Sequence, residues 1–383
     1  METLEALKSR VRGACAQLGV VLLTLGCGHT DPFTDPSQVS DQPFDPSPPV
    51  RLTLNAGSDA EAAWLPDGSG ILYSAAQSSR PDADVCLALL PPSGGSQRQL
   101  TCDVPGGPDL RDGIQSAAPS SDGRLAFLGT SSTLNGEIPF LQVILLSPSL
   151  NPVGAAQIRT FPYTASDGQV HRTASQLRWL GPSLLVYLAE TFDARRACRL
   201  CPLDTIVTGL AVATLDPGSP GRAPTVVPET QFASGVSPGD TPDLIYFTLG
   251  GDTRVFQRTL SSGSVQLIYD FGAAGIARDV HVQGSRMVAT VGGRVAFSND
   301  PELGPTQWDS GGVVHLVDLA GGTDTPLPGP GLFRRPVLAP TSDRVVAEGY
   351  PLIITPRLDS ITGITVKDTT VGRNSDLYLF TLP

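Results

Sequence analysis

The chain has 383 residues, of which 40% are hydrophobic and 16% charged, and its formal net charge is -11. This apolar content excludes a disordered chain, and the acidic charge argues against nucleic-acid binding, which needs a basic surface to displace counterions from phosphates. Glycine (41 residues) and proline (35 residues) are frequent, which predicts many short strands joined by turns. The length is compatible with two domains or with one closed all-β repeat fold.

Residues 1–26 are typical of an export signal. Three basic residues between positions 8 and 12 precede an apolar run that is too short to span a bilayer comfortably. The end of the run, Leu25, Gly26 and Cys27, resembles a bacterial lipobox, in which the cysteine is acylated and becomes the first mature residue. Thr24 departs from that pattern, which prefers leucine at this place. The alternative is a plain secretory signal that happens to precede a cysteine.

Residues 27–49 are rich in Pro, Asp and Ser and show no apolar period. This composition is typical of a stiff, extended tether, so we expect it to hold the following domain, residues 50–383, away from a membrane. Gly28 follows the cysteine, and the resemblance to enterobacterial lipoproteins implies the outer membrane. The expected location is the periplasmic side of a bacterial cell envelope, with a lipid anchor.

A short sequence motif recurs along the chain: apolar residues, a turn rich in Pro, Ser, Asp and Gly, and then a β-branched or aromatic run. It is clearest at residues 62–73, returns at 116–127 and is weaker at 337–346. From residue 50 onward, alternation and turn residues divide the chain into six units of about four strands. The innermost strands are expected to start near Ala62, Gln115, Gln176, Phe232, Ala277 and Pro336. Such self-similarity, at steps of this length, is typical of propeller blades with insertions.

The two ends of this region predict how the ring closes. Residues 374–382 form the expected third strand of the last unit, and residues 50–54 form a strand before the first complete unit. If the two pair, one blade is shared between the ends, and no open strand edge remains. The sequence therefore predicts an all-β fold, a six-bladed β-propeller of four-stranded antiparallel blades whose last blade is closed by the N-terminal strand.

The first unit resembles a known repeat. In order it contains Arg51-Leu52-Thr53, Trp64-Leu65-Pro66-Asp67-Gly68, Ile71-Leu72-Tyr73, Val85-Cys86-Leu87-Ala88 and Arg98-Gln99-Leu100-Thr101. This series resembles a repeat of the TolB-like, WD-like β-propeller group. The second and sixth units match in part, and the third to fifth match mainly by spacing. The resemblance agrees with six blades rather than seven.

Four cysteines lie outside the signal region. Cys86 and Cys102 flank a turn centred on Gly94, so we expect them to lie directly opposite across a hairpin and to form a disulfide. Cys198 and Cys201 have the CxxC spacing of redox or metal motifs, but no second CxxC or His pair supplies further zinc ligands. We interpret them as a second disulfide in a loop of the third blade. Paired thiols fit an oxidising compartment.

No motif for catalysis or metal binding stands out. Residues 235–239 match the G-x-S-x-G pattern of hydrolases, but another strand follows them, so we interpret them as a turn of the fourth blade. The four histidines are scattered. No cofactor and no metal are therefore predicted. Asp-lined propeller channels can hold Ca²⁺, but such a site needs several convergent oxygens, and no motif here supports one.

The long insertions, residues 190–208, 292–311 and 351–373, all join the second and third strands of their blades. By topology these connections share one face, here called the elaborated face, and binding surfaces concentrate on such loops. Polar residues at the start of the innermost strands are candidates for lining the channel mouth. They are Asp112, His171, Arg278, Asp279, Arg334 and Arg335. The alternative for each is a solvated loop charge.

Two functions remain open. The first is a non-enzymatic, monomeric, membrane-tethered scaffold that binds an envelope protein, a peptide or a glycan through the elaborated face. The second is a propeller enzyme of the lyase or lactonase type, with its site at the channel mouth. The scattered histidines and the absence of a nucleophile-plus-base signature count against the enzyme. Three or more carboxylates or imidazoles converging within ligand distance would favour it.

Overall fold

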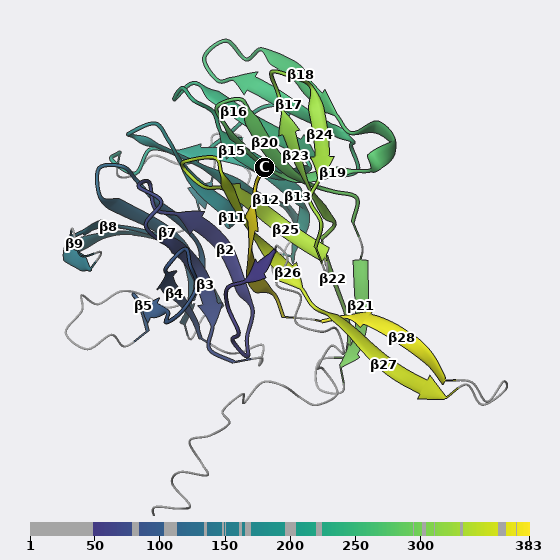
Figure 1. Ribbon diagram of the computed structural model, residues 1–383. Helices are drawn as coiled ribbons and strands as arrows, with labels where there is room; N and C mark the ends of the chain where they lie inside the picture. The colour runs from purple at the N-terminus through teal and green to yellow at the C-terminus, as the bar shows by residue number, and fades with distance from the viewer. Residues whose placement is uncertain are drawn as a thin grey trace, which may run out of the picture. The chain divides into compact units, whose positions relative to one another are not determined.

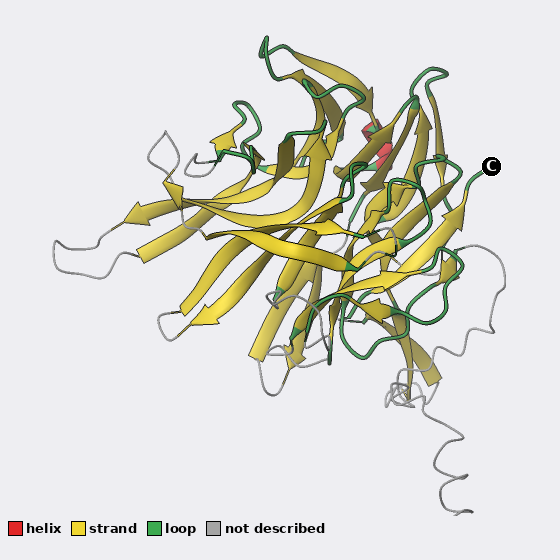
Figure 2. Cartoon of the chain, turned by 90° about the vertical axis from the view of Figure 1, so that its left-hand side faces the viewer, coloured by secondary structure: helices red, strands yellow, loops and turns green. Residues whose placement is uncertain are grey.

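The protein, seen in a computed structural model, is built from β-strands, and the one helical element among the described residues is the short 3-10 turn η1 (Gly272–Ala274) (Figures 1 and 2). The structure describes residues 49–78, 84–102, 113–133, 136–147, 149, 151–160, 163–164, 170–195, 204–219, 224–293, 295–300, 304–309, 311–329, 332–358, 365–372 and 374–383. Among these, no helix is long and apolar enough to cross a membrane. The predicted signal, tether and Cys27 lie outside the described residues, apart from Pro49, and stay predictions.

The chain divides into two compact units. One comprises Met1–Asp41 and Ile353–Asp368, and the other comprises Gln42–Leu352 and Thr369–Pro383. Within the first unit, the described residues belong to strands β27 (Leu352–Leu358) and β28 (Thr365–Val371), which pair as a two-stranded sheet. The second unit holds the blades.

The first three blades follow each other in chain order. Blade one consists of β2 (Asp59–Trp64), β3 (Ile71–Ala76), β4 (Val85–Leu90) and β5 (Arg98–Gln99). Blade two consists of β6 (Ile114–Pro119), β7 (Arg124–Thr133), β8 (Gly136–Leu146) and β9 (Pro152–Thr160). Blade three consists of β11 (Val170–Leu180), β12 (Leu184–Arg195), β13 (Asp204–Leu215) and β14 (Thr225–Val226), with the two-residue strand β10 (Tyr163–Thr164) added beside β11.

The last three blades complete the ring. Blade four consists of β15 (Ala233–Pro238), β16 (Leu244–Leu249), β17 (Arg254–Thr259) and β18 (Val265–Asp270). Blade five consists of β19 (Ala277–Gln283), β20 (Arg286–Val291), β23 (Val313–Asp318) and β24 (Thr323–Pro326). Blade six consists of β25 (Leu332–Leu338), β26 (Arg344–Tyr350), β29 (Asp376–Thr381) and β1 (Val50–Arg51). Each innermost strand contacts the next one, and β25 contacts β2, so the predicted six-bladed antiparallel ring is confirmed.

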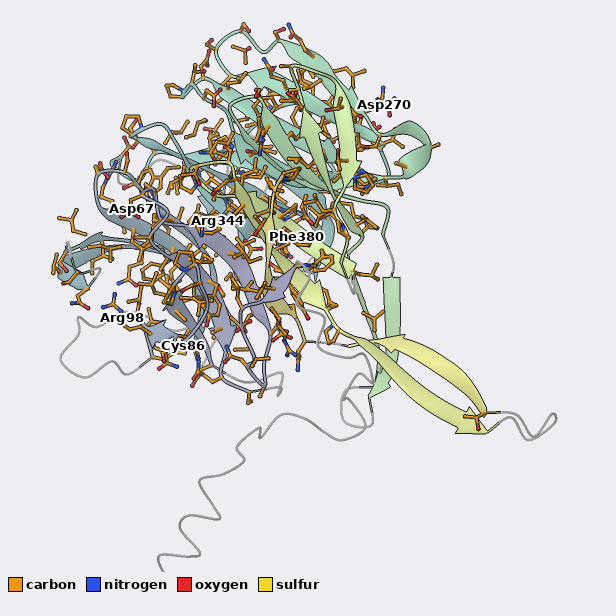
Figure 3. All side chains as sticks on the ribbon, viewed as in Figure 1. Asp67, Cys86, Arg98, Asp270, Arg344 and Phe380 are labelled. Carbon is orange, nitrogen blue, oxygen red and sulfur yellow. A yellow bond between two sulfur atoms is a disulfide. The ribbon has the colours of Figure 1, made fainter. Side chains whose placement is uncertain are left out.

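An apolar cluster lies at each of the six junctions between neighbouring blades. In strand β3, Leu72 packs toward blade two, whereas Ile71 and Tyr73 pack toward blade six, which explains why consecutive residues at the start of this strand are apolar or aromatic. Alternate side chains of a strand point to opposite faces, and both faces of a blade are covered. At the junction of blades one and six, Arg344 (labelled in Figure 3) places its guanidinium 5.1 Å from the ring centroid of Trp64.

The N-terminal strand closes the ring as predicted. Val50 lies opposite Leu379 and Arg51 lies opposite Tyr378, so β1 is the outer strand of blade six. The Leu52 amide continues this pairing by donating to the Leu377 carbonyl at 2.7 Å. Sheet hydrogen bonds therefore join the beginning of the described chain to its end.

The recurring Pro/Asp/Gly motif forms the short turns between the first and second strands of a blade. In blade one, Gly68 adopts φ +72° and its amide donates to the Leu65 carbonyl. In blade six, Ser342 takes the same place, donates to the Ala339 carbonyl and has φ +56°. Glycine adopts this left-handed conformation without strain, and serine does not. The motif in blade six therefore forms the same turn as in blade one, but without the glycine that suits it best.

The predicted insertions are found between second and third strands. Strands β21 (Val295–Asp300) and β22 (Gly304–Asp309) form a hairpin between β20 and β23, and β27 with β28 follow β26 and precede β29. In blade three, β12 and β13 are themselves extended, with pairing from Leu185–Leu215 to Arg195–Asp204. Strands β7 and β8 are extended in the same way, which the sequence analysis did not predict.

The predicted disulfide between Cys86 and Cys102 is present, with a Cα–Cα distance of 5.6 Å. The expected register is wrong by one residue. Leu89 pairs with Arg98 and Ala88 pairs with Gln99, which places position 101, not 102, opposite Cys86. Cys102 reaches Cys86 because it adopts φ +65° just beyond the strand. Cys198 and Cys201 lie outside the described residues, so their pairing stays a prediction.

Candidate functional site

The centre of the propeller is shaped by bulges in the innermost strands. In β2, β11 and β25 the pairing is interrupted at Glu61, Gln176 and Arg335, and these three residues adopt φ values of +55°, +57° and +45°. Such values are unfavourable for residues other than glycine, and they persist where the surroundings hold them in place. The bulges turn three polar side chains of different blades toward a common centre, because a bulge re-aims the residues beside it.

Arg335 is the centre of this arrangement. Its Nη1 donates to both Glu348 carboxylate oxygens at 3.0 Å, and its Nε lies 2.7 Å from Glu61 Oε1. Its backbone amide donates to Asp279 Oδ2 at 3.0 Å. Glu348 is the residue of β26 opposite Arg334, and it is fully buried. One residue of blade six therefore joins carboxylates of blades one, five and six.

Neutral groups extend the arrangement to the other blades. The Ser116 hydroxyl donates to Glu61 Oε2 at 2.8 Å, and the backbone amide of Gln176 donates to the same oxygen at 2.7 Å. The Gln176 side chain donates to Asp279 Oδ1 at 2.8 Å and accepts from the Val236 amide at 2.9 Å. We call the set of Glu61, Ser116, Gln176, Asp279, Arg335 and Glu348 the central network. It makes contacts with all six blades.

Burial and ion pairing act in opposite directions on the charges of the network. Burial raises the pKa of Glu61, and the neighbouring Arg335 opposes that rise. Burial alone would lower the pKa of Arg335, but Glu348, Glu61 and Asp279 outweigh it and raise the pKa well above its usual value. A buried cation surrounded by carboxylates stays charged, so Arg335 is a fixed positive charge at the centre of the molecule.

Two partly buried side chains next to the network, Arg178 and His281, form hydrogen bonds to the backbone. Arg178 donates to the Leu177 carbonyl at 2.7 Å and to the Ala62 carbonyl at 3.2 Å. His281 Nδ1 accepts from the Leu338 amide at 3.3 Å, and burial, with Arg178 nearby, lowers the pKa of His281 to about 3. The imidazole is therefore neutral at pH 7, and its Nδ1 is occupied by a backbone N–H.

A second buried acidic group lies where blade six meets blade one, and we call it the closing seam: Arg51, Thr53, Asn55, Asp59 and Asp376. Burial raises the pKa of Asp59 to about 7, with Asp376 nearby adding to the rise. Burial also raises the pKa of Asp376 to about 6, although Arg51 Nη2 lies 2.7 Å from its carboxylate. Asn55 donates to Asp59 Oδ1 at 2.6 Å. Both carboxyl groups therefore gain or lose protons near neutral pH.

The structure brings together four of the six predicted binding residues. Asp279 and Arg335 belong to the central network, and Arg278 and Arg334 are their chain neighbours at the bulges of β19 and β25. The predicted alternative of a solvated loop charge is wrong for Asp279, which is 3% exposed. His171 lies in β11 opposite Thr191, with its side chain outside the described part, and Asp112 is also outside it.

Four residues of the central network were not predicted from the sequence: Glu61, Ser116, Gln176 and Glu348. A signal was present for two of them, because Glu61 and Gln176 each stand three residues before a tryptophan. Trp64 Nε1 donates to the Val337 carbonyl at 3.1 Å, and Trp179 Nε1 donates to the Ala118 carbonyl at 2.9 Å. Both tryptophans thus reach back to the preceding blade, so alignment on them reveals the equivalent bulges.

Two expectations about chemistry can be compared with the structure. Ser237 of the G-x-S-x-G match lies inside β15 rather than in a turn, and it is fully buried, with its hydroxyl accepting from the Val282 amide. Nor does the described part of the chain gather three or more His, Cys, Asp or Glu side chains in a way that could hold a metal ion. Carboxylate oxygens of Glu61 and Glu348 do converge, but on the Arg335 guanidinium, so this centre does not fit Ca²⁺.

Comparisons with known proteins give likeness of fold alone. No family model and no curated protein sequence matches this chain. Among solved structures it is similar to a gluconolactonase from Xanthomonas campestris (TM-score 0.49, 12% identity, 88% of this chain and 89% of that one). It is also similar to regucalcin from Agrobacterium tumefaciens (TM-score 0.49, 12% identity, 87% and 92%). TolB from Acinetobacter baumannii gives a TM-score of 0.41 and 13% identity over 84% and 65%.

Proposed function

We propose that the protein is a non-enzymatic β-propeller scaffold that binds a protein, a peptide or a glycan through its elaborated face. The observation that carries this proposal is the extension of second-to-third connections in the hairpins β7–β8, β12–β13 and β21–β22. The connections between first and second strands, by contrast, are turns of only a few residues, as at Gly68 and Ser342. Long connections on a rigid scaffold are where binding surfaces form.

The contacts of the central network argue against catalysis by its carboxylates. Glu61, Glu348 and Asp279 each interact with Arg335, and Glu61 and Asp279 also accept hydrogen bonds from Gln176. A general base needs a lone pair that reaches a substrate proton, whereas the oxygens of these carboxylates already contact Arg335 or Gln176. This supports a structural role for the centre and argues against a lactonase or lyase site built on these acids.

For the location, we propose a TolB-like lipoprotein on the periplasmic side of a bacterial envelope, anchored through Cys27, with the outer membrane favoured by Gly28. The support is the basic and apolar leader of residues 1–26 and the Pro/Asp-rich stretch that follows it. The disulfide between Cys86 and Cys102 agrees with an oxidising compartment. The partner is accordingly an envelope component, and nucleic acid is not expected. The protein acts as a monomer in this proposal.

Replacement of one hairpin tests the binding proposal. Residues 296–308 of β21–β22 are exchanged for an Asn-Gly turn, and a control variant carries Asp67→Ser and Asp122→Ser in turns between first and second strands. Tagged proteins are used to capture partners from solubilised envelope of the source bacterium. The hairpin variant should lose a specific partner that the wild type and the control retain. Equal capture by all three, or turnover in a broad substrate screen without a specific partner, would contradict the proposal.

Mass spectrometry of the mature N-terminus tests the anchor separately. The expected product begins at Cys27 and carries added acyl mass, which Cys27→Ala removes. An unmodified terminus downstream of Cys27 would show that the lipobox interpretation is wrong.

A further inference from the structure

Among the described residues at the centre of this acidic protein, positive charges outnumber negative charges. The described part of the central network, with the arginines beside it, contains four guanidinium groups and three carboxylates: Arg178, Arg278, Arg334, Arg335, Glu61, Asp279 and Glu348. All three carboxylates are engaged by Arg335, through its side chain or its backbone amide. The whole chain carries a net charge of -11, so a local excess of cations is unusual in this molecule.

Arg334 is the cation that the network leaves unbalanced. Its Nε is buried and has no hydrogen-bond partner among the described residues. The nearest carboxylate oxygen to this Nε, Asp279 Oδ2, lies 4.0 Å away and already accepts from the Arg335 amide. The Arg334 side chain is nevertheless 22% exposed, so a ligand can reach it. A buried N–H without an acceptor is costly, so an acceptor supplied by a ligand would stabilise this side chain.

Arg278 and Arg334 lie on the two sides of the base of hairpin β21–β22. A Cβ atom added at Gly293 would fall 2.4 Å from Arg278 Cζ, and one added at Gly311 would fall 2.7 Å from Arg334 Cγ. Both glycines flank the hairpin in the chain, and Gly312 pairs with Phe333, the residue before Arg334. The absence of side chains at Gly293 and Gly311 therefore lets both arginines pack closely against the base of an elaborated-face hairpin.

We propose that Arg334, together with Arg278, binds a carboxylate group of a ligand at the channel mouth on the elaborated face. The inference rests on the proposed binding function, which places the site on the elaborated face, and it names the chemical group of the ligand that is bound. A guanidinium fork donates two parallel hydrogen bonds to a carboxylate, and its charge acts more strongly in a partly buried site than in open water. A peptide carboxyl end and a uronic acid present the same group, so the two are distinguished by experiment.

The test is an NMR titration of the full chain, following arginine Nε–H signals, with two pairs of probes. Acetyl-triglycine is compared with its C-terminal amide, and glucuronate is compared with glucose. At least one carboxylate probe should bind and shift the Arg334 signal, whereas its neutral counterpart should not bind. Binding of acetyl-triglycine alone assigns the site to peptide ends, and binding of glucuronate alone assigns it to acidic sugars; either result supports the proposal.

Variants connect the binding to the residue. Arg334→Gln should raise the dissociation constant about tenfold or more, and Arg334→Lys should raise it less. Arg254→Gln, which changes an exposed pair with Asp252, should leave the dissociation constant unchanged. Thermal unfolding confirms that each variant is folded. Equal binding of charged and neutral probes, unchanged binding in Arg334→Gln, or no binding of either carboxylate probe would overturn the proposal. These results are independent of partner capture, so failure here is distinguishable from failure of the scaffold function.

Discussion

The central network and the closing seam both bury carboxylates, but only the central network places a guanidinium between them. Arg335 contacts Glu61 and Glu348 directly, and these carboxylates outweigh burial and keep it a cation. At the seam, Asp59 and Asp376 share a partly exposed Arg51, and the pKa values of both acids rise to near neutrality. The cation of the central network therefore stays charged at any ordinary pH, whereas the closing seam changes its charge near neutral pH.

Removing the cation of the central network should have the largest effect. Arg335→Met leaves Glu61 and Glu348 buried without compensation, and breaking a buried pair in this way costs about 3–5 kcal/mol. The free energy of unfolding, measured with urea at pH 7, should fall by that amount. Part of the loss should return at lower pH, because burial raises the pKa of Glu61 and the variant lacks the cation that opposes this rise.

Arg254→Met is the matched control for this substitution, because Arg254 forms an exposed pair with Asp252 on blade four. It should change the free energy of unfolding by less than about 0.5 kcal/mol. If Arg335→Met were equally mild, the centre would not be held by its ion pairs.

The closing seam should make the protein less stable as the pH rises. Most aspartates have the opposite effect, because folding lowers their pKa. Because folding raises the pKa of Asp59 to about 7 and that of Asp376 to about 6, the folded state binds more protons than the unfolded state above about pH 4. The free energy of unfolding should therefore fall, by about 4 kcal/mol, as the pH rises from about 5 to 8. Urea unfolding at several pH values measures this slope.

Variants assign the slope to the seam. Asp59→Asn cannot ionise and should flatten most of the curve, and the double variant with Asp376→Asn should flatten the rest. Asp270→Asn, on the exposed edge strand β18 (Figure 3), should leave the slope between pH 5 and 8 unchanged. A wild-type protein whose stability rises over this interval would contradict the protonation of the seam.

The smallest effect is expected for Arg51, the cation of the seam. Its side chain is 43% exposed, so solvent screens its pair with Asp376. Arg51→Gln should lower the free energy of unfolding by roughly 0–1 kcal/mol and steepen the pH slope slightly, since Asp376 loses the cation that opposes its rise in pKa. A loss as large as that of Arg335→Met would remove the distinction between the two regions.

The ring could be predicted from sequence because its signals are local. Short apolar runs, the turn at Gly68 and the spacing of units indicate blades, and the strand at residues 50–54 indicates the closure. The extended pairing of β7 with β8 was missed because residues 130–136 are mainly Thr, Ser and other turn-forming residues, which are typical of a loop. Local composition therefore predicts which strands exist better than how far they extend.

The central network could be predicted only in part. Asp279 and Arg335 were found because they are charged residues at the start of innermost strands. Glu61 and Gln176 were missed because their inward direction depends on bulges and positive φ angles, which tertiary packing imposes. The one-residue error at Cys102 has the same origin, since a left-handed residue shifted the register that symmetry about Gly94 predicted.

We conclude that Arg335 and the carboxylates around it hold the six blades together. This is tested by a double-mutant cycle, in which the free energies of unfolding of the wild type, Glu61→Gln, Arg335→Met and the double variant are measured with urea at pH 7. The two substitutions should be strongly non-additive, with a coupling energy of about 1–3 kcal/mol. Additivity within about 0.5 kcal/mol would show that Glu61 and Arg335 do not stabilise each other and would contradict the claim.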